Sequence, residues 1–340
     1  MERNSGILLH PTSLPDAHIC GTFGKPARVW LNDLARNGIG VWQFLPLAPT
    51  DSLGSPYSSP SSFAFNPWFL DENDLVRDCF LPNHLENVSS RIESSDETVD
   101  FQLANSKVKI LSSSLVDYWE KQNATIKEEF HRWHKKQFWL DDHSIFMELK
   151  SQNNNLPWWE WPEKFALYDK KELAKWKKNN EKELLGHNLI QWHLDRQWKS
   201  IRELAKNLGI YLFGDVPFYV SKDSADVWSN RSLFSILTNS NTFLQSGVPP
   251  DYFSETGQLW GNPVYRWSRH KANKFSWWRK RISRHLEQVD FLRLDHFRAM
   301  EAFWAIPGKD KTAENGFWLP SPGKQILNLI KKDCGGSLPL

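Results

Sequence analysis

The chain has 340 residues, 24% of them charged, and its 42 Lys and Arg nearly balance its 40 Asp and Glu. This balance excludes a basic nucleic-acid coat and an acidic tail, and no apolar run reaches the roughly 18 residues of a membrane helix. The three cysteines, Cys20, Cys79 and Cys334, form no CxxC pair, and no signal peptide opens the chain, so we expect a cytoplasmic protein without a disulfide framework.

One pattern recurs along the chain: an amphipathic helix, a glycine or short turn, and a brief apolar strand. The spacing of apolar residues predicts three complete copies, with helices and strands at 27–34 and 40–47, 198–208 and 210–218, and 275–286 and 291–295. A fourth copy has apolar residues at Ile326 and Ile330, and its strand is expected to begin at 337–340.

Helices that alternate with short apolar strands favour a parallel sheet of βα units. Both a (β/α)₈ barrel and a doubly wound sheet bind their ligands at the carboxyl ends of the strands, which is where Asp215 and Asp295 stand. No GxGxxG or GxxxxGK[ST] loop is present to hold a phosphate.

A long polar stretch separates the first copy from the second, and its periodicity predicts a helix-rich insertion. We therefore divide the chain into residues 1–74 with the first barrel units and cleft loops, 75–195 as the insertion, and 196–340 with further barrel units. Residues 83–100 are expected to form an exposed connection. The Ser/Pro-rich stretch 52–68 contains four aromatic residues and is therefore expected to be an ordered, packed loop.

The composition includes 19 tryptophans. Packing is the simpler interpretation of each, but flat ring faces also bind the C–H faces of sugars, and Trp158, Trp159 and Trp161 stand close together. The 11 histidines form no HExxH pattern and no Cys/His cluster, so we expect no metal.

The stretch Arg293-Leu294-Asp295-His296 ends the third predicted strand. Residues two apart on a strand point to the same face, so Arg293 is expected to hold Asp295 ionised. A buried ion pair at a strand end is the structural alternative. In a sugar-binding cleft, an ionised and oriented carboxylate is what a retaining glycosidase needs as its nucleophile.

The stretch FLRLDHFR resembles the nucleophile strand of the 4-α-glucanotransferases called amylomaltases or disproportionating enzymes, which are relatives of the α-amylases. Residues 6–15, 42–67, 214–228 and 247–267 also resemble this family, in the same order and spacing. The resemblance implies an α/β fold with a TIM-type (β/α)₈ barrel and helix-rich insertions. It also implies transfer of α-1,4-glucan segments between maltooligosaccharides or linear α-1,4-glucans, without a metal or organic cofactor.

The resemblance also implies roles for individual residues. Asp295 corresponds to the nucleophile, which forms a covalent glucosyl-enzyme, and Arg293 to the arginine that orients it. The loop 247–257 corresponds to one that leans over the acceptor. Residues expected to line the sugar subsite or border the cleft are Tyr57, Asp215, His296, Gln258, Trp260 and Asn262.

A retaining mechanism needs a second carboxyl group as general acid and base, about 5–5.5 Å from the nucleophile. In the family it is a glutamate on the next barrel strand, and the chain stops where that strand is expected to begin. We therefore expect residues 1–340 to be the N-terminal portion of a longer protein, with about half of the barrel, no general acid of its own and no transferase activity.

Three other functions remain open. The segment FSWWRKRISRHLEQ at 275–288 mixes aromatic and basic residues, so it could bind RNA, although an amphipathic helix with a solvated basic face is the simpler interpretation. A non-catalytic glucan-binding protein and a plain hydrolase are the other two. The sequence does not indicate an oligomeric state.

Overall fold

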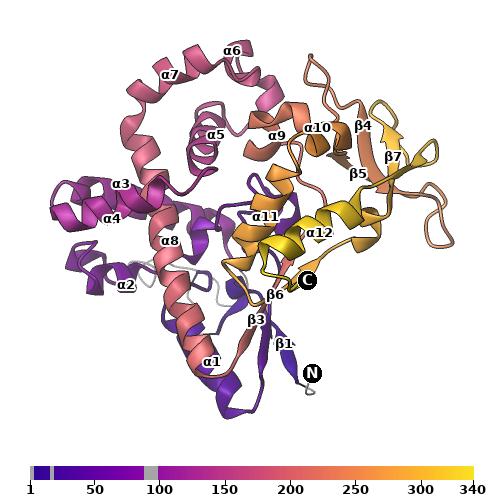
Figure 1. Cartoon of the computed structure of the whole chain (residues 1–340). Helices are drawn as coiled ribbons and strands as arrows, with labels where there is room; N and C mark the ends of the chain where they lie inside the picture. Colours follow the sequence, from indigo (N-terminus) through magenta and orange to yellow (C-terminus); the bar gives the residue numbers. More distant parts are fainter. Residues whose placement is uncertain (1–3, 16–18, 88–98) are drawn as a thin grey trace.

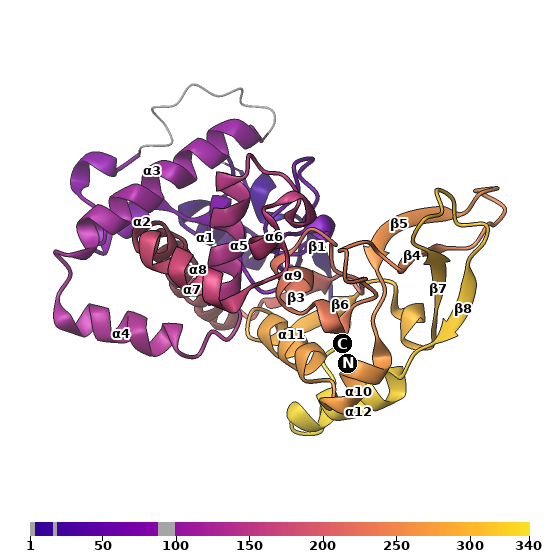
Figure 2. The same ribbon diagram turned by 90° about the horizontal axis from the view of Figure 1, so that it is seen from above.

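Two four-stranded sheets and a set of helices form the computed structural model, which describes residues 4–15, 19–87 and 99–340. A parallel sheet lies at the centre, most of the helices lie on one side of it, and an antiparallel sheet lies on the other (Figures 1 and 2). The fold is therefore α/β, as predicted.

The central sheet has the strand order β1 (Gly6–Leu8), β2 (Val41–Gln43), β3 (Tyr211–Val216) and β6 (Phe291–Leu294), with every pair parallel. The three predicted repeats supply β2, β3 and β6, which confirms the parallel arrangement, while β1 was not predicted. Residues 337–340 form no strand, yet the Leu292 amide donates to the Pro339 carbonyl at 2.9 Å. The fourth repeat therefore brings this segment beside β6.

The two faces of the parallel sheet differ sharply. On one face Trp42, Leu212 and Leu292 are fully buried, and Trp42 packs against Trp198 of the covering helix α8 (Glu181–Asn207), with ring centroids 6.2 Å apart. On the other face Tyr211 and Phe291 pack against each other but remain 48% and 37% exposed. Because side chains alternate along a strand, Tyr211 and Phe291 share their face with Asp215 and Arg293, which lie nearer the carboxyl ends of the strands.

The helices of the four predicted repeats are present as α1 (Lys25–Arg36), α8 (Glu181–Asn207), α11 (Ser276–Leu286) and α12 (Gly323–Asp333). Helix α8 is continuous across residue 195, where the sequence analysis placed a boundary. The helices expected in the insertion are present, whereas residues 88–98 of the expected connection lie outside the described residues. The other helices before α8 are α2 (Glu72–Arg77), α3 (Phe101–Trp119), α4 (Ala124–His134), α5 (Leu140–Gln152), α6 (Glu163–Ala166) and α7 (Lys170–Asn179).

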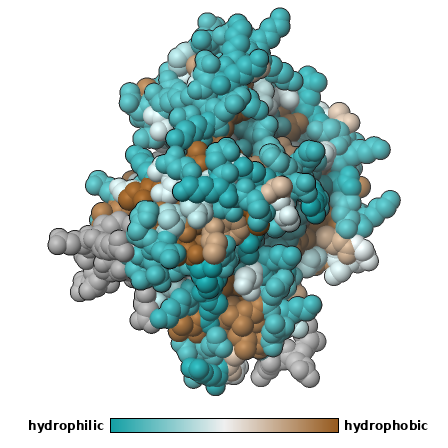
Figure 3. Space-filling model, turned by 90° about the vertical axis from the view of Figure 1, so that its left-hand side faces the viewer, coloured by the Kyte–Doolittle hydropathy of each residue, from teal (hydrophilic) through white to brown (hydrophobic). Residues whose placement is uncertain are grey.

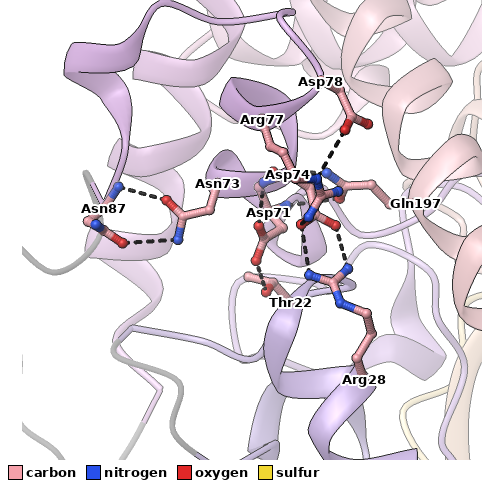
Figure 4. A network of polar contacts seen from close by, with 9 residues as sticks. All are labelled: Thr22, Arg28, Asp71, Asn73, Asp74, Arg77, Asp78, Asn87 and Gln197. Carbon is pink, nitrogen blue, oxygen red and sulfur yellow. Dashed lines mark hydrogen bonds and ion pairs between the residues drawn. The ribbon is translucent and has the colours of Figure 1, made fainter.

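A polar network joins the start of the insertion to the central helices (Figure 4). Arg28 of α1 donates to both carboxylate oxygens of Asp74 in α2, at 2.6 and 2.8 Å. Asp71 caps α2 by accepting from the Asp74 amide, and its own amide donates to Gln197 of α8. These contacts fix α2 against α1 and α8.

An antiparallel sheet that the sequence analysis missed has the order β5 (Gln258–Pro263), β4 (Leu244–Val248), β7 (Ala302–Pro307) and β8 (Phe317–Pro320). Its strands come from two separate stretches of the chain, and the pairing of β4 with β7 joins the two stretches. The short helices α9 (Ala225–Ser229) and α10 (Trp267–Ala272) lie between the two sheets in sequence. This sheet brings β5 to the carboxyl end of the parallel strands.

Most tryptophans serve packing. Trp158 and Trp161 are buried, which confirms the packing interpretation for these two, while Trp159 is half-buried beneath the Lys222 ammonium. The stretch 52–68 is ordered and largely buried, as predicted. Polar side chains cover most of the face shown in Figure 3. Among the described residues, no helix is long and apolar enough to cross a membrane.

The expectation of a solvated basic face on residues 275–288 was wrong for three of its five basic residues, whereas Arg279 is partly exposed and Lys280 is exposed. Arg281, Arg284 and His285 of α11 are buried. Arg284 forms an ion pair with Asp195 of α8 at 2.6 Å. The guanidiniums of Arg281 and Arg284 point inwards because main-chain carbonyls and a carboxylate, contributed by distant segments, accept their hydrogen bonds.

Candidate active site

The ends of two neighbouring parallel strands place the acidic residues together. Asp215 of β3 stands directly opposite Arg293 of β6 in the strand register, and Asp295 follows two residues later. Residues opposite each other, or two apart along a strand, point to the same face of the sheet. His296 begins the next turn with φ of 53°, a left-handed conformation that is uncommon for residues other than glycine.

One guanidinium joins the two carboxylates. Arg293 donates through Nη1 to Oδ2 of Asp215 at 2.6 Å and through Nη2 to Oδ1 of Asp295 at 2.5 Å. The Tyr57 hydroxyl, from the ordered loop, also donates to Oδ2 of Asp215, at 2.8 Å. We call these four residues the acid cluster.

The two carboxylates have different surroundings. The Asp215 side chain is 2% exposed and that of Asp295 is 38% exposed. Burial raises the pKa of Asp215, and the hydrogen bond from Tyr57 and the charge of Arg293 oppose this rise. Burial also raises the pKa of Tyr57, and the hydrogen bond to Asp215 adds to the shift. The Tyr57 hydroxyl therefore stays protonated and remains a donor.

Arg293 remains a cation in this setting. Its partial burial alone would lower its pKa, but the charges of Asp215 and Asp295 outweigh this and raise the pKa above the usual value. Burial lowers the pKa of His296, with the Asp295 carboxylate acting in the opposite direction. The His296 imidazole is therefore favoured in its neutral form.

Strand β5 borders the acid cluster. The Trp260 ring contacts the His296 ring edge-on, with centroids 4.8 Å apart, and its Nε1–H donates to Oε1 of Gln258 at 3.1 Å. Gln258 and Trp260 are two residues apart along this strand, so they share one face, and Trp260 directs that face at His296. Asn262 follows Gly261, where a φ of 74° and a shift in the pairing with β4 interrupt the alternation, so the strand pattern does not fix the direction of its side chain.

Three buried polar atoms at this place have no hydrogen-bond partner in the described part of the chain. They are Oδ1 of Asp215, Nε2 of His296 and the Tyr219 hydroxyl. Buried polar groups without partners are rare in native structures, and they often mark the place of a ligand or water. Tyr219, whose ring lies 6.2 Å from those of Trp260 and His296, was missed by the sequence analysis. Its only signal was its place just after the strand that carries Asp215.

The connection between β4 and β5 carries two unpacked aromatic side chains. Tyr252 and Phe253 are 98% and 94% exposed, and their rings contact each other. Exposed neighbouring aromatic residues on a loop are unusual unless they meet a ligand or partner. This loop lies within 247–257, the segment for which the sequence analysis predicted a role over the acceptor.

The described residues gather no group of three or more His, Cys, Asp or Glu side chains that could hold a metal ion. The acid cluster and the side chains beside it supply two carboxylates, one guanidinium, two phenols, one imidazole and one indole. They can bind a polyhydroxylated ring through hydrogen bonds, and they can present one accessible carboxylate to it.

A family model described as 4-alpha-glucanotransferase matches residues 9–339. A curated 4-alpha-glucanotransferase of Synechocystis is 39% identical over 100% of the chain and 67% of its own length. The Thermus thermophilus relative of the same name is 37% identical over 98% of the chain and 66% of its own length. The solved amylomaltase of Streptococcus agalactiae, in complex with acarbose, superposes with a TM-score of 0.92 at 32% identity, covering 99% of this chain and 68% of that one.

The chain thus spans about two thirds of the length of these relatives. Matches of this coverage and identity extend over the whole of the chain, including both sheets and the acid cluster. The chain therefore belongs to the 4-α-glucanotransferase family of enzymes.

Proposed function

We propose that this chain forms the nucleophile side of an active site that transfers α-1,4-glucan segments between maltooligosaccharides by a retaining double displacement. The observation that supports this most directly is the single guanidinium of Arg293 held between a buried and an accessible carboxylate. Such a pairing fixes the accessible group of Asp295 in position while leaving one of its oxygens free to react.

In this mechanism Asp295 attacks the anomeric carbon and forms a covalent glucosyl-enzyme, and Arg293 orients it. Asp215, Tyr57 and His296 bind hydroxyls of the sugar ring beside the cleaved bond. Their role follows from the unpartnered Oδ1 of Asp215 and Nε2 of His296, which need hydrogen-bond partners.

The face of β5 supplies the other wall of the cleft. Trp260 offers an apolar ring to a sugar face, while Gln258 and Asn262 offer amide groups to its hydroxyls. Tyr252 and Phe253, exposed on their loop, are placed to contact the acceptor glucan that resolves the covalent intermediate through its 4-hydroxyl.

The leaving oxygen needs a proton, and Asp215 is poorly suited to give it. Burial raises the pKa of Asp215, but its side chain is only 2% exposed, and its Oδ2 already accepts from Tyr57 and Arg293, both of which favour the ionised form. We place the general acid in a segment that corresponds to the remaining third of the relatives' length. The chain alone is then expected to bind glucan without efficient transfer.

The parallel sheet is proposed to be part of a (β/α)₈ barrel of the α-amylase kind. Tyr211 and Phe291 leave the inner face of the sheet apolar and exposed, and further strands would cover it. Within this barrel we retain the division into 1–74, 75–195 and 196–340, with α8 shared by the last two regions.

The free cysteines Cys20, Cys79 and Cys334 suit a reducing cytoplasm.

The test compares products from maltotriose by chromatography. Three proteins are needed: the 340-residue chain, the same chain fused to the remaining third of the Synechocystis relative, and the fusion with Asp295→Asn. We expect glucose and longer oligomers from the fusion only, since general acid catalysis contributes about 10²–10⁴-fold to the rate.

Robust transfer by the 340-residue chain would mean that its own residues include the acid. Normal activity of the Asp295→Asn fusion would refute the nucleophile assignment. Binding of maltotriose without turnover in the fusion would favour a non-catalytic glucan-binding protein, and glucose without longer oligomers would favour a hydrolase.

A further inference from the structure

A second cavity, of about 170 Å³, lies apart from the acid cluster, among α5, α9 and α11. These three helices lie close together in Figures 1 and 2. No residue of the acid cluster lines this cavity, and neither His296 nor Trp260 does. Its wall also includes Ser61 and Phe63, from the same loop that carries Tyr57.

Aromatic rings form much of the cavity wall. Phe63 lies at their centre, with ring centroids 5.0 Å from Phe138, 6.5 Å from Trp139 and 5.9 Å from Trp277. Phe138 is about half exposed, so it stands at the mouth, while the other three are buried. The cavity therefore offers several apolar ring surfaces to a small molecule.

Carboxyl groups and donors complete the wall. Asp226 is 3% exposed and accepts from the Ser62 amide at 2.8 Å, and burial raises its pKa to about 6. Asp142 accepts from the hydroxyl of Tyr168. Across the cavity, the Lys280 ammonium lies 4.5 Å from the centroid of the Phe138 ring. Acceptors and donors thus face the same space.

This combination selects the class of ligand. Two carboxyl groups would disfavour an anion, and the Lys280 ammonium would disfavour a cation. A neutral ligand with hydroxyl groups suits both, because a hydroxyl can donate and accept hydrogen bonds. The volume is several times the ~30 Å³ of one water and well below the ~300 Å³ of a drug-sized pocket. One sugar ring fits these limits, with its C–H face on the aromatic wall.

We propose that this cavity binds a single neutral hexose, D-glucose, at a site separate from the acid cluster. The choice of glucose rests on the proposed function, in which transfer from maltotriose releases it. The Ser62 amide donates a hydrogen bond to the Asp226 carboxyl group, and the Ser62 hydroxyl accepts one from Arg281 at 2.7 Å. A hexose in the cavity would therefore act on the loop that positions Tyr57, as a product that regulates its own formation.

The test measures D-glucose binding to the 340-residue chain by isothermal titration calorimetry. Phe138→Ala and Lys280→Ala change exposed residues at the mouth, so both variants should fold, which circular dichroism verifies. Phe317→Ala removes a similarly exposed ring from β8, outside the cavity, and serves as the matched control. Asp215→Asn reports on glucose bound at the acid cluster instead.

We expect one glucose site whose Kd rises at least tenfold in Phe138→Ala and Lys280→Ala and stays unchanged in Phe317→Ala and Asp215→Asn. Absence of glucose binding, or a loss confined to Asp215→Asn, would overturn the proposal. Binding of methylammonium but not of glucose, with the same sensitivity to the two mouth substitutions, would also overturn it. These outcomes are independent of whether the fusion protein transfers glucan, so the failure of one proposal does not imply failure of the other.

Discussion

The buried guanidinium of Arg281 on α11 allows a quantitative test of the packing. It is 0% exposed, and its Cζ lies 5.4 Å from the ring centroids of both Trp277 and Trp278. Its nitrogens donate to the main-chain carbonyls of Pro217 at 2.6 Å and Phe218 at 3.0 Å. These carbonyls directly follow β3, the strand that carries Asp215.

Arg281→Met keeps an apolar side chain of similar length but removes every donor. The Phe218 carbonyl keeps the Tyr265 hydroxyl as a donor, at 2.6 Å, whereas the Pro217 carbonyl loses its side-chain donor. One acceptor left without its partner costs about 1–3 kcal/mol, so the free energy of unfolding should fall by about that amount. The matched control is Arg279→Met on the same helix. Arg279 pairs with Asp333 at 2.6 Å, but both side chains are about one third exposed, so this change should cost no more than about 1 kcal/mol.

Chemical denaturation of the three proteins, followed by tryptophan fluorescence, gives both differences. Equal losses for Arg279→Met and Arg281→Met would refute the reasoning, because the argument depends on burial and not on charge. The two variants can be compared directly by their denaturation midpoints if the denaturant slope is the same for all three proteins. If the slope of Arg281→Met differs, its free energy of unfolding is calculated from its own slope and midpoint.

Three further predictions concern the site and its surroundings. Because the pKa of Asp226 is about 6 when folded and near 4 when unfolded, its contribution to stability should fall by about 2–3 kcal/mol as the pH rises through that window. Asp226→Asn should remove this fall, and parallel unfolding curves across the window for both proteins would contradict it. In the fusion protein, Arg293→Lys should lower kcat about 10²-fold, since one ammonium cannot hold two carboxylates in the geometry of a guanidinium; an unchanged kcat would count against the orienting role. Saturating maltotriose should quench the fluorescence of the fusion protein, and Trp260→Phe should remove most of the quenching if Trp260 lines the cleft.

Local patterns were sufficient for the central part of the fold. The apolar spacing of 198–208 and 275–286 reports a single buried helix face, and the strands that follow are short apolar runs, as expected for parallel strands covered by helices. The positions of Asp215 and Asp295 at strand ends follow from the same periodicity. Their side chains meet because parallel strands end at one edge of a sheet.

Features that depend on distant segments could not be predicted in this way. Strand β4 pairs with β7 across more than fifty residues of intervening chain, and no short-range signal encodes that pairing. Arg281 looked solvated because basic residues usually are, whereas its acceptors lie on a loop and on the segment after β3. The cavity beside Asp226 is likewise assembled from four separate segments.

The acid cluster gives two otherwise similar side chains different surroundings, which supports the different roles that we propose for them. Asp215 and Asp295 share the guanidinium of Arg293, so its charge alone does not distinguish them. Burial does: Asp215 is enclosed and receives a second donor from Tyr57, whereas Asp295 stays accessible with one oxygen unbound by Arg293. A nucleophile must reach its target, so the enclosed carboxylate is suited to binding hydroxyls and to holding Arg293. Because both residues are aspartates, their proposed roles differ only through their surroundings, namely burial and the hydrogen bond from Tyr57.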